Sequence, residues 1–166
     1  MRVLLIAYDN DSFIHYFPLG LAYIASAFQQ AGHEVIIYPQ DKYHLSEEHL
    51  TQYLDKNWFD IVGTGMCAGY YQHSRLKAIS DAVRMVKYKP ILIIGGLLVS
   101  PDPKYFWHLT AADYVFVGEV DHLIKGIKWE KNPEQSIWIG EPAQVNLLPW
   151  PAWELFDIDY YSLIRL

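Results

Sequence analysis

The sequence predicts an α/β fold of the doubly wound class, with five parallel strands and helices on both faces of the sheet. Short, continuous apolar runs alternate with longer segments in which apolar residues recur at helical spacing. Such alternation predicts right-handed crossovers that connect parallel strands. At 166 residues, the chain is long enough for one domain of this kind and a tail.

The first half of the chain predicts three strands and two helices. Residues 3–8 form a continuous apolar run, which is typical of a strand covered on both faces. Leu21, Ile24, Ala25 and Phe28 then recur at helical spacing, and Gly32 supplies the stop signal. The predicted elements are a strand at 3–8, a helix at 18–32, a strand at 34–38, a polar helix at 46–55 and a strand at 60–64.

The second half predicts two further strands, each preceded by a helix. From residue 73 to 87 the apolar positions share one helical face, and Pro90 ends that helix and introduces the next strand. In order, the predicted elements are a helix at 73–87, a strand at 91–94, a short helix at 103–108 and a strand at 114–117. From Lys128 onward the pattern fails, so the prediction is a domain at 1–128 and an extended, proline-punctuated linker at 129–166.

Composition excludes several classes of protein. The formal net charge is −6, and no segment of the sequence gathers Lys and Arg into a basic stripe with interleaved aromatic residues. We therefore expect no nucleic-acid partner. Apolar runs are of strand length, well below the roughly 20 residues of a membrane span, and no signal peptide is recognisable, so we expect a cytoplasmic protein without a membrane partner. The single cysteine, Cys67, excludes a multi-cysteine cluster within this chain and is expected to be a small buried residue.

Any ligand is expected on the loops that follow the parallel strands. These loops are residues 9–17, 39–43, 63–73, 95–102 and 118–121, and three of them begin with glycine. A glycine there would let a ligand approach the backbone, although tight turn geometry explains a single glycine equally well. The first loop lacks both the glycines of a dinucleotide site and the row of hydroxyls of a flavin site.

Five motifs stand in order along the chain: PLGLAYIA (18–25), AGHEV (31–35), DIVG (60–63), Gly95-Gly96 with Ser100-Pro101, and ADYVFVGE (112–119). Together they resemble the amino-terminal cobalamin-binding domain of radical SAM enzymes, which has a flavodoxin-like, Rossmann-like fold. The tail LPWPAWELF (148–156), followed by Tyr160-Tyr161, is similar to the bridge that leads to the catalytic barrel of these enzymes.

The resemblance implies that the corrin of cobalamin lies over the strand ends and that its nucleotide tail runs down beside the sheet. It implies three groups of cofactor contacts: Thr64, Gly65 and Met66 after the third strand, Gly95, Gly96 and Ser100 after the fourth, and Gly118 with Glu119 after the fifth. Two of these residues also have a purely structural explanation. Thr64 could be an ordinary β-branched strand residue, and Ser100 could be a helix cap.

The sequence also departs from related cofactor enzymes. The older cobalamin enzymes place Asp-x-His-x-x-Gly after the first strand, whereas His15 stands at a different spacing from Asp11 and is more simply an ordinary loop histidine. The chain also lacks the three-cysteine loop that would hold a four-iron four-sulfur cluster for S-adenosylmethionine. We therefore expect no catalytic residues and no protein metal ligand in this chain.

Two functions remain open, with a third that is weaker. The first is a cobalamin-binding module of a radical SAM enzyme, a methyltransferase or a related radical enzyme, that is not catalytic alone because its radical SAM domain is missing. The alternative is a cofactor-free, flavodoxin-like interaction domain that packs on a catalytic partner domain. Its tail aromatics, Trp150, Trp153, Phe156, Tyr160 and Tyr161, would cover that partner or form a homodimer. A small hydrolase that uses Asp9, Asp11 and Glu119 lacks any nucleophile–base pair.

Overall fold

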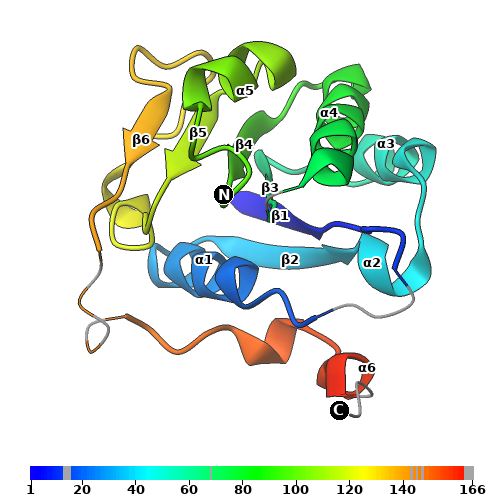
Figure 1. Ribbon diagram of the computed structural model, residues 1–166, viewed down its shortest axis with the longest axis horizontal. Helices are drawn as coiled ribbons and strands as arrows, with labels where there is room; N and C mark the ends of the chain where they lie inside the picture. The colour runs from blue at the N-terminus through cyan, green and yellow to red at the C-terminus, as the bar shows by residue number, and fades with distance from the viewer. Residues whose placement is uncertain (13–15, 68, 143, 145, 147, 163–166) are drawn as a thin grey trace.

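The protein contains a six-stranded parallel sheet flanked by helices (Figure 1). The computed structural model describes residues 1–12, 16–67, 69–142, 144, 146 and 148–162. The strand order is β2-β1-β3-β4-β5-β6, and every neighbouring pair is parallel. The strands are β1 (Arg2–Ala7), β2 (Glu34–Pro39), β3 (Ile61–Gly65), β4 (Ile91–Gly95), β5 (Tyr114–Val117) and β6 (Ile137–Ile139).

Helices cover both faces of this sheet. In Figure 1, α3, α4 and α5 lie on one side and α1 lies on the other. The helices are α1 (Leu19–Gln30), α2 (Gln40–Tyr43), α3 (Glu47–Lys56), α4 (Tyr70–Met85), α5 (Pro103–Thr110) and α6 (Ile158–Ser162), with short 3-10 turns η1 (Ile124–Gly126) and η3 (Trp153–Leu155). Within the described residues, none of these helices is both long enough and apolar enough to cross a membrane.

Alternating side chains of the strands divide the core in two. Leu4, Ile6 and Val62 pack on the face that α3, α4 and α5 cover, whereas Val3 and Leu5 pack with Phe28 of α1 on the other face. A strand buried on both faces must be apolar at consecutive positions, which explains the continuous runs in the sequence. The predicted doubly wound α/β fold is therefore confirmed.

Local sequence signals explain where the helices begin and end. The Ser46 hydroxyl caps α3 by accepting a hydrogen bond from the backbone N–H of His49. Asp102 caps α5 in the same way, and Pro103 occupies its first turn, where a missing N–H does no harm. After α1, Gly32 adopts a left-handed backbone conformation that turns the chain toward β2.

The predicted number of strands, five, is wrong, because β6 adds a sixth. This strand lies within residues 129–166, the segment predicted to be an extended linker, and pairs through Val115↔Ile137, Phe116↔Trp138 and Val117↔Ile139. Its three residues are too short to carry a recognisable period, and only pairing with β5 defines them as a strand. That the segment leads to a further domain stays a prediction.

The tail beyond β6 folds back along α1 and β2. Phe156 and Tyr161 are buried against Ala22 of α1, with Phe17 in ring contact with both. The backbone N–H of Ala152 also donates to the carbonyl of Ala22, at 3.1 Å. The interaction-domain alternative expects Phe156 and Tyr161 to be exposed. They are buried instead, because their own domain already covers them.

Candidate functional site

The strand order identifies one edge of the sheet as the place for a ligand. Strand β1 lies between β2 and β3 in the sheet. The connection after β1 leads to β2 on one side of it, whereas the connection after β3 leads to β4 on the other side, so these two loops diverge at the carboxyl end of the sheet. Ligands of open α/β sheets bind outside the carboxyl ends of the strands, at such a switch point. All eight residues predicted as cofactor contacts follow or end the adjacent strands β3, β4 and β5 on this edge.

After β3, only one of the three predicted contact residues has room for a ligand. Thr64 is buried, and its hydroxyl donates a hydrogen bond to the carbonyl of Ile6 in β1, at 3.2 Å. Met66 is also buried, with its side chain in the core. Gly65 is exposed, and a Cβ added there would have the Gly95 carbonyl oxygen, at 3.9 Å, as its nearest neighbour. A ligand could therefore approach the backbone at Gly65.

The loop after β4 is held tightly against the loop after β3. The Met66 N–H donates to the Gly95 carbonyl, and the Leu98 N–H donates to the Met66 carbonyl, each at 3.1 Å. Gly96 has a φ of +91°, and a Cβ there would lie 2.4 Å from the Met66 carbonyl oxygen. Ser100 does not cap α5 but donates to the carbonyl of Gly96, at 3.0 Å. Glycine at position 96 is thus required by the backbone itself, whether or not a ligand binds.

The loop after β5 shows the same kind of packing. Gly118 has a φ of +73°, and a Cβ there would lie 2.6 Å from the carbonyl oxygen of Gly140, which follows β6. Glu119 is exposed beside it. Asp121, two residues further on, has a carboxylate oxygen, Oδ1, that is buried without a hydrogen-bond partner. Sequence reasoning included Asp121 in the candidate loop but did not select it, because burial of one oxygen atom has no sequence signal.

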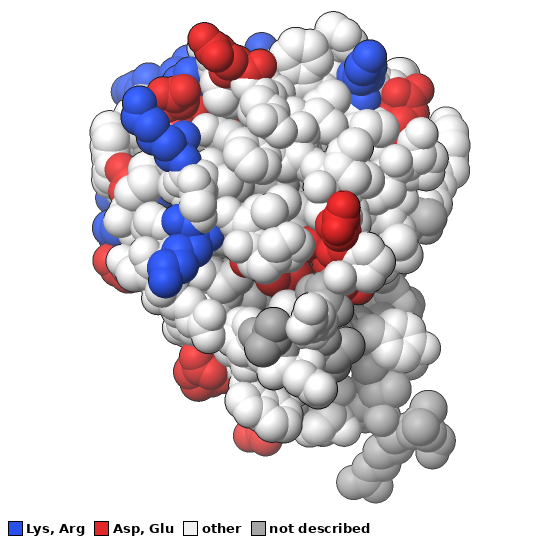
Figure 2. Space-filling model, turned by 90° about the vertical axis from the view of Figure 1, so that its left-hand side faces the viewer, with Lys and Arg blue, Asp and Glu red and all other residues white. Residues whose placement is uncertain are grey.

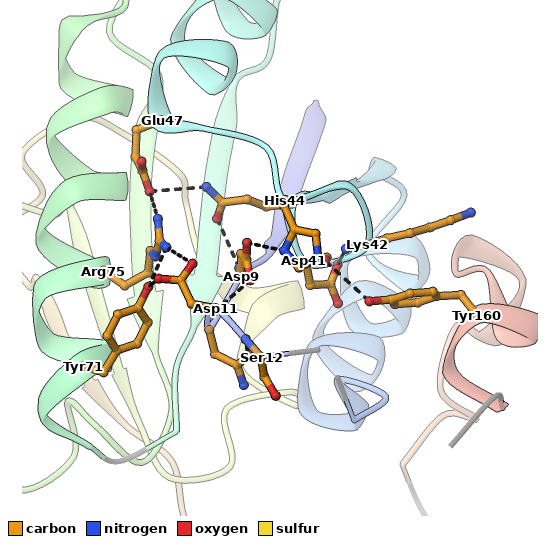
Figure 3. A network of polar contacts seen from close by, with 12 residues as sticks. Asp9, Asp11, Ser12, Asp41, Lys42, His44, Glu47, Tyr71, Arg75 and Tyr160 are labelled. Carbon is orange, nitrogen blue, oxygen red and sulfur yellow. Dashed lines mark hydrogen bonds and ion pairs between the residues drawn. The ribbon is translucent and has the colours of Figure 1, made fainter. Parts of the chain in front are cut away.

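A polar network joins the loops that follow β1, β2 and β3 (Figure 3). Arg75 of α4 lies at its centre and donates hydrogen bonds to Glu47 at the start of α3, to Asp11 at 2.9 Å and to the Tyr71 hydroxyl at 2.6 Å. Tyr71 in turn donates to Asp11. The network was not predicted, because its members come from the loop after β1, the start of α3 and the first turns of α4, which are distant in sequence and meet only in the fold.

A second part of the network anchors the first residues after β1. Asp9 is buried, and its carboxylate bonds to Nδ1 of His44, at 2.9 Å, and accepts from the Asp11 N–H, at 2.8 Å. Both His44 and Asp11 have left-handed backbone conformations, which non-glycine residues adopt rarely and often near functional sites. The start of the loop after β1 is therefore fixed from both sides, by Arg75 and by His44.

Exposed apolar side chains occur on the loops at the same edge. Tyr70 at the start of α4 is 92% exposed, and Leu97 after β4 is 69% exposed. Tyr16, after β1, is exposed as well, whereas His15 lies outside the described residues. Large apolar side chains that remain in water at a ligand-binding edge are typical of a surface that another molecule covers.

The site contains no cluster of metal-ligating side chains within the part of the chain that the structure describes. No three His, Cys, Asp or Glu side chains among these residues are arranged to hold a metal ion. Cys67 is exposed rather than buried as expected, because it lies in the loop after β3 and not in the strand. Burial raises the pKa of the neighbouring Tyr8 phenol, which keeps that hydroxyl protonated at neutral pH.

Other surfaces are less suited to a broad ligand. Two cavities of about 540 and 290 Å³ lie along the tail, and the smaller one is lined by β2, α2 and residues around Phe156. They belong to the docking of the tail rather than to the carboxyl edge. On the side of the molecule that carries β6, basic and acidic side chains are interspersed (Figure 2).

Comparison with known proteins relates this arrangement to cofactor-binding domains. A family model for the B12 binding domain matches residues 12–128. Among solved structures, the chain is similar to the radical S-adenosylmethionine methyltransferase TsrM from Kitasatospora setae, with 16% identity and a TM-score of 0.63. The match covers 75% of this chain and only 24% of TsrM, so this chain spans about a quarter of that protein's length. At this identity the likeness shows the fold alone.

A response regulator from Burkholderia multivorans also matches, with 15% identity and a TM-score of 0.46, over 74% of this chain and 87% of that protein. Among curated protein sequences, none matches the chain.

Proposed function

Because this chain belongs to the B12-binding domain family, we propose that it binds cobalamin over the carboxyl ends of β3, β4 and β5, as the cofactor module of a larger radical SAM enzyme. The family match carries the proposal, since it extends from within the loop after β1 to the segment after η1 and includes the loops after β3, β4 and β5. Cobalamin is the cofactor that this family binds.

The residues at the carboxyl edge fit a broad, partly apolar ligand of this kind. Gly65 leaves its backbone open, and the exposed side chains of Tyr70 and Leu97 offer apolar surface to the edge of a corrin ring. These two features support binding at this edge.

The proposal assigns binding and orientation, not catalysis, to the residues of this chain. When bound, cobalamin would supply methyl-transfer or radical chemistry at its cobalt. Gly65, Gly95 and Glu119 would contact the cofactor, while Thr64, Met66 and Ser100 would act by holding the loops in place through their internal hydrogen bonds. Gly96 and Gly118 would let those loops approach one another closely.

The radical SAM context belongs to the proposal. TsrM is a radical S-adenosylmethionine methyltransferase with this fold in about a quarter of its length, which supports a similar division of labour here. The iron–sulfur cluster, S-adenosylmethionine and the methyl-transfer or related reaction would then belong to a catalytic domain outside this chain. The cytoplasmic location expected from the sequence stays a prediction.

Two glycine variants test the placement of the cofactor. Replacing Gly65 by leucine puts a bulky side chain on the proposed binding edge, and no internal atom lies closer than 3.9 Å to the first added carbon. We expect at least about a tenfold loss of affinity for hydroxocobalamin, because the side chain would separate the corrin from the backbone. Affinity is measured by titration followed in visible absorbance. Gly96 is unsuitable for this test, since substitution there disturbs the backbone directly.

Gly126→Leu is the matched control, because Gly126 also has open space around it but is the last residue of η1 rather than of a strand. It should bind hydroxocobalamin like the wild type. Equal affinity of the Gly65→Leu variant and the wild type would show that the cofactor does not lie over this edge.

The cofactor-free interaction domain remains the second candidate. It is favoured by Trp150 and Trp153, which are exposed on the tail even though their neighbours are packed on the domain. A wild-type protein that retains no corrin absorbance after removal of free ligand, yet elutes as a dimer, would support this candidate and contradict the first.

A further inference from the structure

Two adjoining hollows lie along the tail, beside the edge strand β2. The larger, of about 540 Å³, is lined by residues of the tail between Trp153 and Asp159. The smaller, of about 290 Å³, lies between the tail and the end of β2 with α2. Phe156 and Asp157 line both hollows, which together are called the tail groove below. The larger volume falls within the range of roughly 300–1,000 Å³ that is usual for binding pockets.

The tail carries apolar side chains toward the groove as well as toward its own domain. Phe156 and Tyr161 are buried against α1, whereas Trp153 and Ile158 are exposed and line the larger hollow. Tyr43 of α2 is exposed as well and lines the smaller one. In Figure 1 the tail runs below α1 and β2, on the outside of the domain. Apolar side chains gathered at an exposed hollow are typical of a surface that another molecule covers.

The groove is also negatively charged. Glu154, Asp157 and Asp159 line the larger hollow. Lys42 is the one cation among the described residues that line the groove, and it forms an ion pair with Asp157. Glu154 and Asp159 therefore add negative charge that no described lining cation neutralises. Figure 2 shows acidic side chains at the lower end of the molecule, where the tail lies.

The charge of the groove argues against a second copy of this chain as its occupant. In a twofold dimer the same surface patch of each copy meets its counterpart, so carboxylates would face carboxylates. Each copy also carries a net charge of −6. Like charges brought together across an interface are unfavourable, and the phosphates of a nucleic acid or an anionic membrane would be repelled in the same way. The charge instead favours a basic occupant.

We propose that the tail groove docks a basic, partly apolar polypeptide segment of a partner protein. Apolar side chains of this segment fill the hollows beside Ile158 and Tyr43, and its lysine or arginine side chains pair with Glu154 and Asp159. An apolar centre with a charged rim is the usual arrangement of a protein interface. The inference goes beyond the proposed function, because it concerns a different surface and does not require cobalamin.

A fluorescently labelled, amphipathic peptide of leucine and lysine is the probe. Two matched peptides replace either every lysine by glutamate or every leucine by serine. Fluorescence anisotropy should show that the wild type binds the leucine–lysine peptide at least about tenfold more tightly than either matched peptide. Added salt should weaken this binding, because it screens exposed ion pairs. Equal binding of the three peptides overturns the proposal.

A pair of double variants tests the charge of the groove. Glu154→Gln combined with Asp159→Asn should weaken binding of the leucine–lysine peptide about fivefold, since it removes two surface ion pairs. The control combines Glu48→Gln with Glu134→Gln, which removes two exposed carboxylates outside the groove and leaves the same net charge. This control should bind within about twofold of the wild type.

A pair of single variants tests the apolar part. Ile158→Ala should weaken binding about fivefold, because it removes apolar surface that the peptide covers. Trp150→Ala is the control, since Trp150 is also exposed on the tail but lines neither hollow. All the substituted side chains are exposed, so the melting temperatures should stay close to that of the wild type.

Weaker binding by both groove variants, and not by their controls, supports the proposal. Groove variants that bind like their controls overturn it, because the peptide would then bind another surface or respond only to the total charge. A wild type that elutes as a dimer, but as a monomer after Ile158→Ala, also overturns it, since a second copy would then cover the groove. Hydroxocobalamin binding is measured separately, so the proposed function and this inference can fail independently.

Discussion

At the scale of single residues, Asp121 makes the stability of the domain depend on pH. Its carboxyl pKa is raised, first by burial and then by Glu119, so the folded protein holds this proton more tightly than the unfolded chain does. A group of this kind contributes stability below its unfolded pKa of about 4 and loses that contribution as the pH rises through its folded pKa. The ligand-free wild type should therefore lose stability over this range.

The pH prediction is tested against Asp121→Asn, which cannot titrate. Urea unfolding of both proteins from pH 4 to pH 7 should show the wild type falling in free energy of unfolding relative to the variant as the pH rises. A difference that is constant over this range would mean that the carboxyl group of Asp121 is not perturbed.

The residues of the site were only partly predictable from the sequence. Three candidate loops were predicted to begin with glycine, but Gly63 lies inside β3, and the physical reason for glycine differs among the positions at the strand ends. At Gly96 and Gly118 the reason is backbone from another loop, which no local pattern can reveal, whereas Gly65 has open space. The hydroxyl of Thr64 was predicted to face a ligand, and in the structure it bonds to β1.

At the scale of elements, Arg75 of α4 connects its own helix to the start of α3 and to the loop after β1. Its side chain is largely buried and bonds to Glu47, Asp11 and Tyr71. Charge-assisted bonds to a partly buried arginine each contribute on the order of 1.5–3 kcal/mol, and removal leaves Glu47 without its cation.

We expect Arg75→Ala to lower the free energy of unfolding by about 2 kcal/mol. It should also increase hydrogen exchange at residues 9–12, because the loop after β1 loses its anchor. Lys77→Ala is the matched control in the same helix: its ion pair with Asp81 is exposed and should contribute less than about 1 kcal/mol. Unchanged exchange at 9–12 in Arg75→Ala would contradict this role.

The regular elements were predicted more successfully than their connections. Five strands and four helices follow from apolar runs, helical spacing and caps such as Ser46, because these signals are local. Strand β6 and the short helix α2 were missed, because each is too short for a period and depends on its neighbours. The Arg75 network was also missed, because it too depends on residues that are distant in sequence and meet only in the fold.

At the scale of the whole molecule, the tail is part of the folded domain. Phe156 is buried between α1 and the tail, and Tyr161 donates a hydrogen bond to the buried carboxylate of Asp41, at 2.6 Å. The Lys42–Asp157 ion pair joins the tail to α2 as well. These contacts bring residues more than a hundred positions apart together beside the loop after β2.

Two aromatic substitutions on the tail should therefore differ sharply. Phe156→Ala should destabilise the protein by about 3 kcal/mol, because it opens a cavity against α1. Trp150→Ala should change stability by less than about 0.5 kcal/mol, since this side chain is 87% exposed. Chemical denaturation of both variants measures the difference, and equal effects would mean that the tail does not dock as described.

The account makes one central claim about the whole molecule, that cobalamin lies over the carboxyl edge of β3, β4 and β5. A crystal structure of the protein with hydroxocobalamin tests this claim most directly. It should show the corrin against Gly65. A corrin bound at the tail, or anywhere away from this edge, would contradict the claim.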